Sequence, residues 1–170
     1  ADFLVLGESP GSGADATGVP FTDEGGGREL LSLLADLGFV ESPDSDEPTV
    51  ENVFLTTLTR CHHPDRGPTD DEVRNCEGFL TAEIRMINPE IILPVGQRPL
   101  DALAAEYTTK RVDDFDAVAD HATTIRGRGF ELVPMIAPEE QTDAQLAELG
   151  DHLASLLDRD YRQTKGRRSR

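Results

Sequence analysis

A carboxylate inside a glycine-rich turn is the feature of this sequence that could do chemistry. Glu8 follows the short apolar run at residues 3–6, in a turn made of Gly7, Glu8, Ser9, Pro10 and Gly11. A short continuous apolar run is typical of a buried parallel strand, and open α/β folds bind ligands at the carboxyl ends of such strands. Glycine lets the backbone approach a ligand closely. The sequence therefore favours a binding site here, with an ordinary turn carrying an exposed acid as the alternative.

A second turn supplies an aromatic side chain. Residues 18–21 read Gly-Val-Pro-Phe, and three glycines at positions 25–27 then open a leucine-rich helix. Phe21 is placed to close over a planar ligand. We expect Glu8 and Phe21 to share one pocket.

Strands and helices alternate along the rest of the chain. Apolar runs predict strands at residues 3–6, 53–58, 91–96 and 131–136, and apolar spacing predicts helices at 30–37, 69–87, 99–106 and 142–156. Thr69 and Thr142 each begin a capping box. This pattern predicts a three-layer α/β/α sandwich around a central four-stranded parallel sheet. Residues 41–51 are expected to form an acidic surface loop, and residues 108–128 show no clear pattern.

The chain is expected to form one domain over residues 1–157, followed by a basic, disordered tail at 158–170. The formal net charge is −17, with 33 acidic and 16 basic residues. Taken alone this charge argues against nucleic acid as a partner. Because the acids are spread through well-patterned elements, it also fits a halophilic protein whose self-repulsion is screened by salt. No stretch is long and apolar enough for a membrane helix, and no signal peptide is apparent, so a cytoplasmic protein is expected.

In the order and spacing of its motifs, the chain resembles the uracil-DNA glycosylase superfamily. It is most similar to the iron–sulfur branch known as family four. The resemblance covers roughly residues 3–157 and rests on the segments 7–11, 18–21, 59–61, 68–69 and 89–96, together with Cys76.

The resemblance implies hydrolysis of the N-glycosidic bond of uracil or a related damaged base, as in base excision repair. Such an enzyme takes the nucleotide out of its stack and holds it in a pocket. Glu8 matches the catalytic carboxylate, which steadies an oxocarbenium-like sugar or orients water. Phe21 matches the stacking aromatic, and backbone N–H groups of the turn could bind the departing base. DNA, single-stranded or with a flipped base, is the expected partner of a monomer.

Two positions depart from the family pattern. Thr57 stands where the family has an asparagine that reads the uracil edge, and Ala137 stands where a histidine contacts the leaving base. A hydroxyl cannot offer the paired donor and acceptor of an amide. A changed substrate, a slow enzyme, or a catalytically inactive member that still binds nucleic acid or nucleobases therefore stay open.

The two cysteines, Cys61 and Cys76, are too few and too widely spaced for a metal site of their own. By resemblance they match the second pair of ligands of a [4Fe–4S] cluster. The first pair is then expected in an amino-terminal segment missing before Ala1. The alternative is one loop thiol and one core thiol.

Polar residues that follow the predicted strands are weaker candidates. His62 and His63 could replace the lost histidine as donors to a base or phosphate, with solvent exposure as the alternative. Arg60, Arg126 and Arg128 could meet phosphates, although surface arginine is an equally good explanation.

Overall fold

The computed structural model describes residues 1–23, 26–159 and 161. Its central sheet has five strands in the order β4-β1-β5-β7-β6. The strands are β1 (Phe3–Gly7), β4 (Val53–Thr57), β5 (Ile91–Pro94), β7 (Glu131–Leu132) and β6 (Ile125–Arg126). The first four are parallel, as predicted, and a bridge between Val95 and Met135 continues the pairing of the last predicted strand.

The fifth strand, β6, was not predicted. It pairs antiparallel with β7 and makes the sheet mixed. It has only two residues and lies in the segment whose sequence shows no alternation, so its pairing depends on the neighbouring strand rather than on local pattern.

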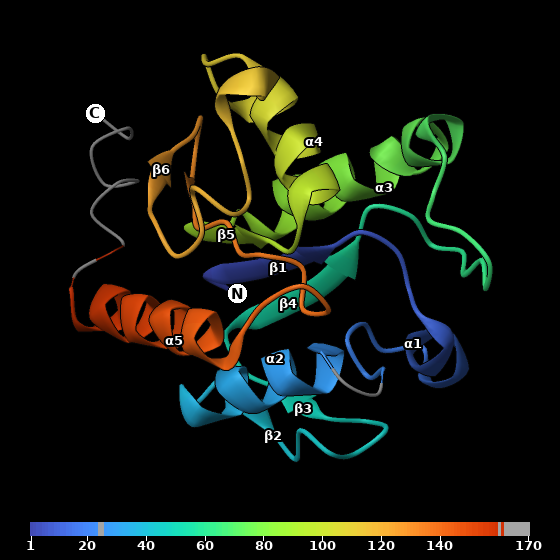
Figure 1. Ribbon diagram of the computed structural model, residues 1–170, viewed down its shortest axis with the longest axis vertical. Helices are drawn as coiled ribbons and strands as arrows, with labels where there is room; N and C mark the ends of the chain where they lie inside the picture. Colours follow the sequence, from blue (N-terminus) through green and yellow to red (C-terminus); the bar gives the residue numbers. More distant parts are fainter. Residues whose placement is uncertain (24–25, 160, 162–170) are drawn as a thin grey trace.

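Helices cover both faces of the sheet, giving the expected three layers (Figure 1). Helices α2 (Gly26–Asp36) and α5 (Asp143–Asp158) pack on one face, and α3 (Asp70–Ile87) and α4 (Gln97–Tyr107) on the other. Alternate residues of β1 pack into the cores on the two faces of the sheet. Phe3 and Val5 join the core beneath α2 and α5, while Leu4 and Leu6 join the core beneath α3 and α4.

Local signals set the helix boundaries. Both predicted capping boxes are present, with Thr69 paired to Glu72 and Thr142 paired to Gln145. Gly38 has a φ of +88°, as expected of a residue that ends a helix. The predicted acidic loop carries a small hairpin of β2 (Val40–Glu41) and β3 (Thr49–Val50). Two further short elements are α1 (Ser12–Thr17) and the 3₁₀ helix η1 (Val112–Asp114).

The carboxyl-terminal part of the described chain returns to the first strand. Arg159 pairs with Glu131, and Tyr161 donates a hydrogen bond to Asp2 and packs edge-on against Phe3. Residues 160 and 162–170 of the predicted disordered tail lie outside the described residues. Within the described ranges, every helix is too short or too polar to cross a lipid bilayer.

Candidate active site

A cavity of about 350 Å³ opens at the carboxyl ends of β1, β5 and β7. This is the edge of a parallel sheet at which ligands are expected. Its lining comes from four separate stretches of chain and from Val95: Gly7, Glu8 and Ser9, then Phe21, Asp23, Gly26 and Gly27, then Gly67, then Ala137, Pro138 and Glu139. Glu8 and Phe21 therefore line the same cavity.

Phe21 forms an aromatic wall that rests on the end of β1. The residue is 9% exposed, and its backbone has a φ of +67°. A Cβ at position 7 would lie 3.0 Å from Cζ of the Phe21 ring. Glycine at position 7 is therefore what lets the outer end of the ring approach the strand end closely.

Glu8 lies in the turn after β1, where a second loop holds it. Its carbonyl accepts a hydrogen bond from the Thr59 amide at 3.2 Å. Its Oε1 lies 3.1 Å from where a Cβ of Gly67 would be, so a larger residue at position 67 would press on the carboxylate. The loop at residues 59–69 thus packs over the turn and limits the room around Glu8.

Thr57 lies beside the cavity with its hydroxyl already used. It pairs with Gly7 across the parallel ladder, and its methyl carbon lies 3.4 Å from the Gly7 Cβ position. Its Oγ1 donates to the Thr59 carbonyl at 2.6 Å. The methyl group therefore faces Gly7, and Thr57 is not among the residues that line the cavity. Ala137 does line it.

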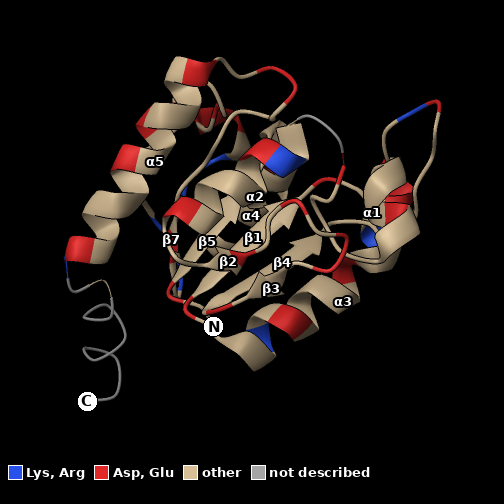
Figure 2. Cartoon of the chain, turned by 90° about the horizontal axis from the view of Figure 1, so that it is seen from below, with Lys and Arg blue, Asp and Glu red and all other residues tan. Residues whose placement is uncertain are grey.

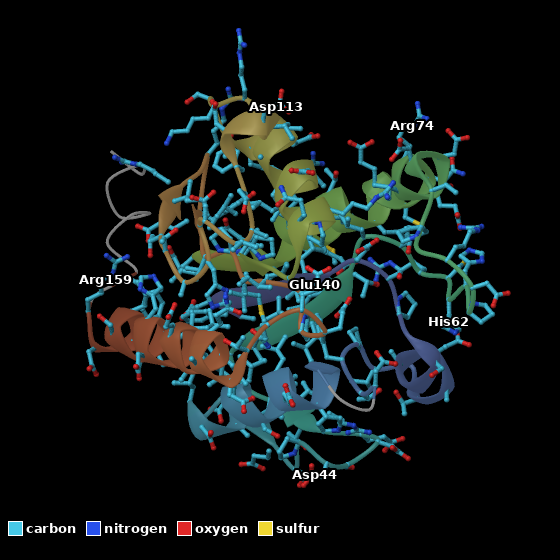
Figure 3. All side chains as sticks on the ribbon, viewed as in Figure 1. Asp44, His62, Arg74, Asp113, Glu140 and Arg159 are labelled. Carbon is cyan, nitrogen blue, oxygen red and sulfur yellow. The ribbon has the colours of Figure 1, made fainter. Side chains whose placement is uncertain are left out.

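Pro10 and Gly11 belong to the same turn but lie outside the cavity lining. The Pro10 carbonyl accepts a hydrogen bond from Nδ1 of His62 at 3.0 Å, and Figure 3 shows His62 in the loop beside α1. Gly11 is the N-cap residue of α1. Their part in this structure is to support the turn.

Asp23 is a cavity residue that sequence reasoning missed. Its Oδ1 accepts the Ala14 N–H of α1 at 3.0 Å, and a Cβ at Gly11 would lie only 2.4 Å from that oxygen. This carboxylate caps α1 from a distant turn, in the role that an N-cap side chain usually fills. The Gly13 position is also crowded by Asp23. Gly11 at the N-cap and Gly13 in the first turn of α1 were the available signal, because both leave room for a partner side chain.

The second histidine of the loop makes a different contact. Nε2 of His63 donates to Glu72 at 2.5 Å, and Arg66 donates to the same carboxylate at 2.6 Å. The hydrogen bonds from Arg66, the Thr69 backbone and His63 lower the pKa of Glu72 to about 2. Neither His62 nor His63 lines the cavity. Both hold the loop in place.

Each of the two cysteines is a neighbour of Arg60, Cys61 in sequence and Cys76 in space. Cys61 is exposed at the loop start and Cys76 is partly buried on α3. Burial lowers the pKa of Arg60, and the nearby Cys76 opposes this shift electrostatically. Arg60 also pairs with Glu83 and lies over the Phe79 ring, with 5.6 Å from its guanidinium carbon to the ring centre. In the described part of the chain, no three His, Cys, Asp or Glu residues gather as a metal site.

The other two arginine candidates lie elsewhere. Arg126 is in β6, and the Arg128 amide donates to the Tyr107 carbonyl. Neither lines the cavity.

Comparison with known proteins identifies the family. The model of the uracil DNA glycosylase superfamily matches residues 1–156, and the chain belongs to this superfamily. The type-5 uracil-DNA glycosylase of Thermus thermophilus is 32% identical over 117 residues, which are 65% of this chain and 53% of that protein. The type-4 uracil-DNA glycosylase of Saccharolobus solfataricus is 28% identical over 168 residues, 97% of this chain and 70% of that protein.

A second type-4 enzyme, from Archaeoglobus fulgidus, is 31% identical over 133 residues, 78% of this chain and 58% of that protein. The matches thus span between about half and 70% of the length of these relatives.

Proposed function

We propose that this protein is a DNA glycosylase that hydrolyses the N-glycosidic bond of uracil or a related damaged base. The observation that supports this most directly is the shared cavity, in which the Glu8 carboxylate and the Phe21 ring face one space at the mouth of a parallel sheet. Membership of the superfamily supports the same reaction class. DNA, single-stranded or with a flipped base, is the proposed partner of a monomeric protein.

The proposed reaction begins with a nucleotide extruded from its stack. Its base packs on Phe21, whose position against Gly7 leaves the opposite side of the cavity for the sugar. As the glycosidic bond breaks, positive charge develops on the sugar, and Glu8 stabilises it or orients the attacking water. Gly67 of the loop at residues 59–69 lies close to the carboxylate and limits the room beside it.

The departing base gains negative charge, and here the cavity offers little help. Among the described residues that line it, none is Lys, Arg or His, and the charged side chains are the carboxylates of Glu8, Asp23 and Glu139. Donors to the base must come from the Ser9 hydroxyl and from backbone N–H groups. Removing one preorganised donor costs on the order of 10²–10³ in rate. We therefore expect slow release of unmodified uracil.

A second candidate function follows from the same observation. With Thr57 turned to the Thr59 carbonyl and Ala137 unable to donate, the cavity could hold a base without cleaving it. The chain would then be a non-catalytic member that binds nucleic acid or a nucleobase.

By the resemblance to family four, the two cysteines match half of a [4Fe–4S] site. Both lie near Arg60, one exposed and one partly buried, and we propose that they are two of four ligands, with the others outside the residues described. A bound cluster would join the loop at 59–69 to α3. Iron and acid-labile sulfide per chain, measured on the product of the complete gene, should fall in Cys61→Ser and in Cys76→Ser. Unchanged iron in both variants would exclude these ligands.

Base release from single- and double-stranded oligonucleotides tests the main proposal. Uracil and other damaged bases should be compared in molar salt, with wild type beside Glu8→Gln and with Glu140→Gln as the control. Glu140 is an exposed neighbour that does not line the cavity, and Figure 3 labels it. We expect Glu8→Gln to lose 10²–10⁴-fold in rate and Glu140→Gln to match wild type. Binding without release in wild type selects the second candidate.

A further inference from the structure

A buried histidine outside the cavity holds the backbone of its far wall. His121 is 8% exposed and lies in the segment that showed no clear pattern in the sequence. Its Nδ1 accepts the Ile136 N–H at 2.9 Å, and its Nε2 donates to the Gln145 carbonyl of α5 at 2.7 Å. These two bonds fix one neutral tautomer, because one ring nitrogen must accept while the other donates.

The segment at residues 135–138 needs this support. Met135 still bonds to the sheet, through its amide to Pro94 and its carbonyl to the Gly96 amide. At Ile136 the chain leaves the ladder, and the buried amide takes its acceptor from the histidine ring. A buried backbone N–H without an acceptor is rare and costly.

The residues that follow Ile136 are the cavity wall. Ala137 and Pro138 both line the cavity, and the Ala137 carbonyl accepts the amides of Glu140 and Gln141 at 2.9 and 3.1 Å. Pro138 is so close to α2 that a Cβ at Gly26 would lie 2.3 Å from its Cβ. A shift at Ile136 would therefore disturb a wall that packs closely against α2.

We propose that His121 is a positioning residue of the base cavity: by accepting the Ile136 amide it sets the place of Ala137 and Pro138 opposite Glu8 and Phe21. The inference rests on the proposed function for its catalytic consequence, but the hydrogen bond itself can be tested without activity. Misplacing a reacting group by about 1 Å can cost on the order of 10²-fold in rate.

Two substitutions at His121 each keep one of its two hydrogen bonds and remove the other. In His121→Asn the side-chain Oδ1 takes the place of Nδ1 and can still accept the Ile136 amide. In His121→Gln the amide reaches the Nε2 position and can still donate to Gln145. His152 of α5 provides a matched control, because its Nε2 bonds to the Thr124 hydroxyl of the same segment at 2.8 Å without touching the cavity wall.

The experiment compares four proteins, which are wild type, His121→Asn, His121→Gln and His152→Ala. Hydrogen exchange of the Ile136 amide, followed by NMR, reads the bond directly. We expect protection in wild type, His121→Asn and His152→Ala, and faster exchange in His121→Gln. With base release assayed well below each melting temperature, kcat should fall on the order of 10²-fold in His121→Gln alone, with KM changed less.

Three outcomes overturn the proposal. The first is a wild-type kcat in His121→Gln although its Ile136 amide exchanges faster. The second is an equal loss of kcat in His121→Asn and His121→Gln. The third is a loss of kcat in His152→Ala in proportion to its drop in melting temperature. If wild type releases no base, the proposed function fails separately. In that case the positioning role of His121 is tested by the affinity of the same variants for a uracil-containing single-stranded oligonucleotide. Weaker binding in His121→Gln alone supports the positioning role, and equal binding in all four excludes it.

Discussion

Thr57 and Ala137 limit what the cavity can do for a departing base. The Thr57 hydroxyl donates to the Thr59 carbonyl, which leaves a methyl group toward Gly7. Ala137 contributes a methyl group to the wall. The sequence alone showed that an amide and an imidazole are absent. The direction in which the Thr57 hydroxyl points depends on the loop backbone after β4, which no local pattern specifies.

Restoring both groups should raise uracil release. In the double variant Thr57→Asn, Ala137→His, the amide can pair with the base edge and the imidazole can donate to the leaving base. We expect release of uracil at least about tenfold faster than wild type, since one donor is worth on the order of 10²–10³ and new side chains are imperfectly placed. Single-turnover release from a uracil oligonucleotide measures it.

Thr57→Val is the control for that experiment. It keeps the shape and loses the hydroxyl, so it should cost about 1 kcal/mol of stability and leave release unchanged. A large loss of release in Thr57→Val would mean that the hydroxyl contacts substrate after all.

The placement of Glu8 and Phe21 in one cavity was predictable because strand, turn and glycine spacing are all local signals. Asp23 and His121 were not, because each acts on a backbone amide that folding alone brings to it. Asp23 meets Ala14 through a turn, and His121 meets Ile136 across the sheet edge. Neither shares a motif with its partner.

At the scale of elements, the four predicted helices and the parallel strands followed their apolar patterns, and two of these helices begin at the predicted capping boxes. The sequence did not predict α1, the β2–β3 hairpin or β6, and β6 depends on β7 for its pairing. The apolar periodicity of the sequence did not predict which residues of these elements line the cavity. Helix α2 lines the cavity with Gly26 and Gly27. Glycine is needed at both positions because other segments of the protein pack closely against them. Pro138 packs against Gly26, and the Phe21 carbonyl lies 2.8 Å from a Cβ position at Gly27.

Two glycine-to-alanine substitutions in helices should act in opposite directions. Gly26→Ala places its Cβ against Pro138, so we expect about 1–3 kcal/mol of destabilisation from overpacking and slower base release. Gly78→Ala in α3 meets nothing within 4 Å and should stabilise by roughly 0.5–1 kcal/mol. Urea unfolding of both variants measures the difference. A neutral Gly26→Ala would show that the α2 contact can relax.

The loop at residues 59–69 should loosen in acid through Glu72. The pKa of this carboxyl is lowered from 4.5 to about 2 in the folded protein, so its contribution to stability is present above about pH 4.5 and is lost as the pH falls toward 2. Urea midpoints between pH 6 and 3 should fall less steeply in Glu72→Gln than in wild type. Glu77→Gln, on the same helix, serves as the control and should follow the wild-type slope.

At the scale of the whole molecule, the main feature is the excess of acidic over basic residues. Figure 2 shows Asp and Glu on several helices and loops, with few Lys and Arg among them. Several of the arginines are already paired with acids, as Arg28 is with Asp46, Arg66 with Glu72 and Arg98 with Asp70. Among the described residues, these pairs reduce the basic surface that could meet phosphates, and the proposed binding of DNA is expected to rely mainly on stacking and burial of the base.

Salt should stabilise the fold. With a net charge of −17, self-repulsion is strong at low ionic strength and is screened as the Debye length falls to about 3 Å at 1 M. We expect the melting temperature to rise from 0.1 to 2 M KCl. Sorbitol at matched water activity is the control, since it does not screen charge. An equal rise in sorbitol would assign the effect to preferential exclusion instead.

The walls of the cavity lie far apart along the chain, from Gly7 to Glu139. No early fragment of the chain contains both sides, so a partly folded or prematurely ended polypeptide would lack a complete cavity. During refolding from urea, circular dichroism should therefore recover before base release does, because the last parallel pairing completes the cavity. Enzymatic competence would then report that the final stage of folding is complete.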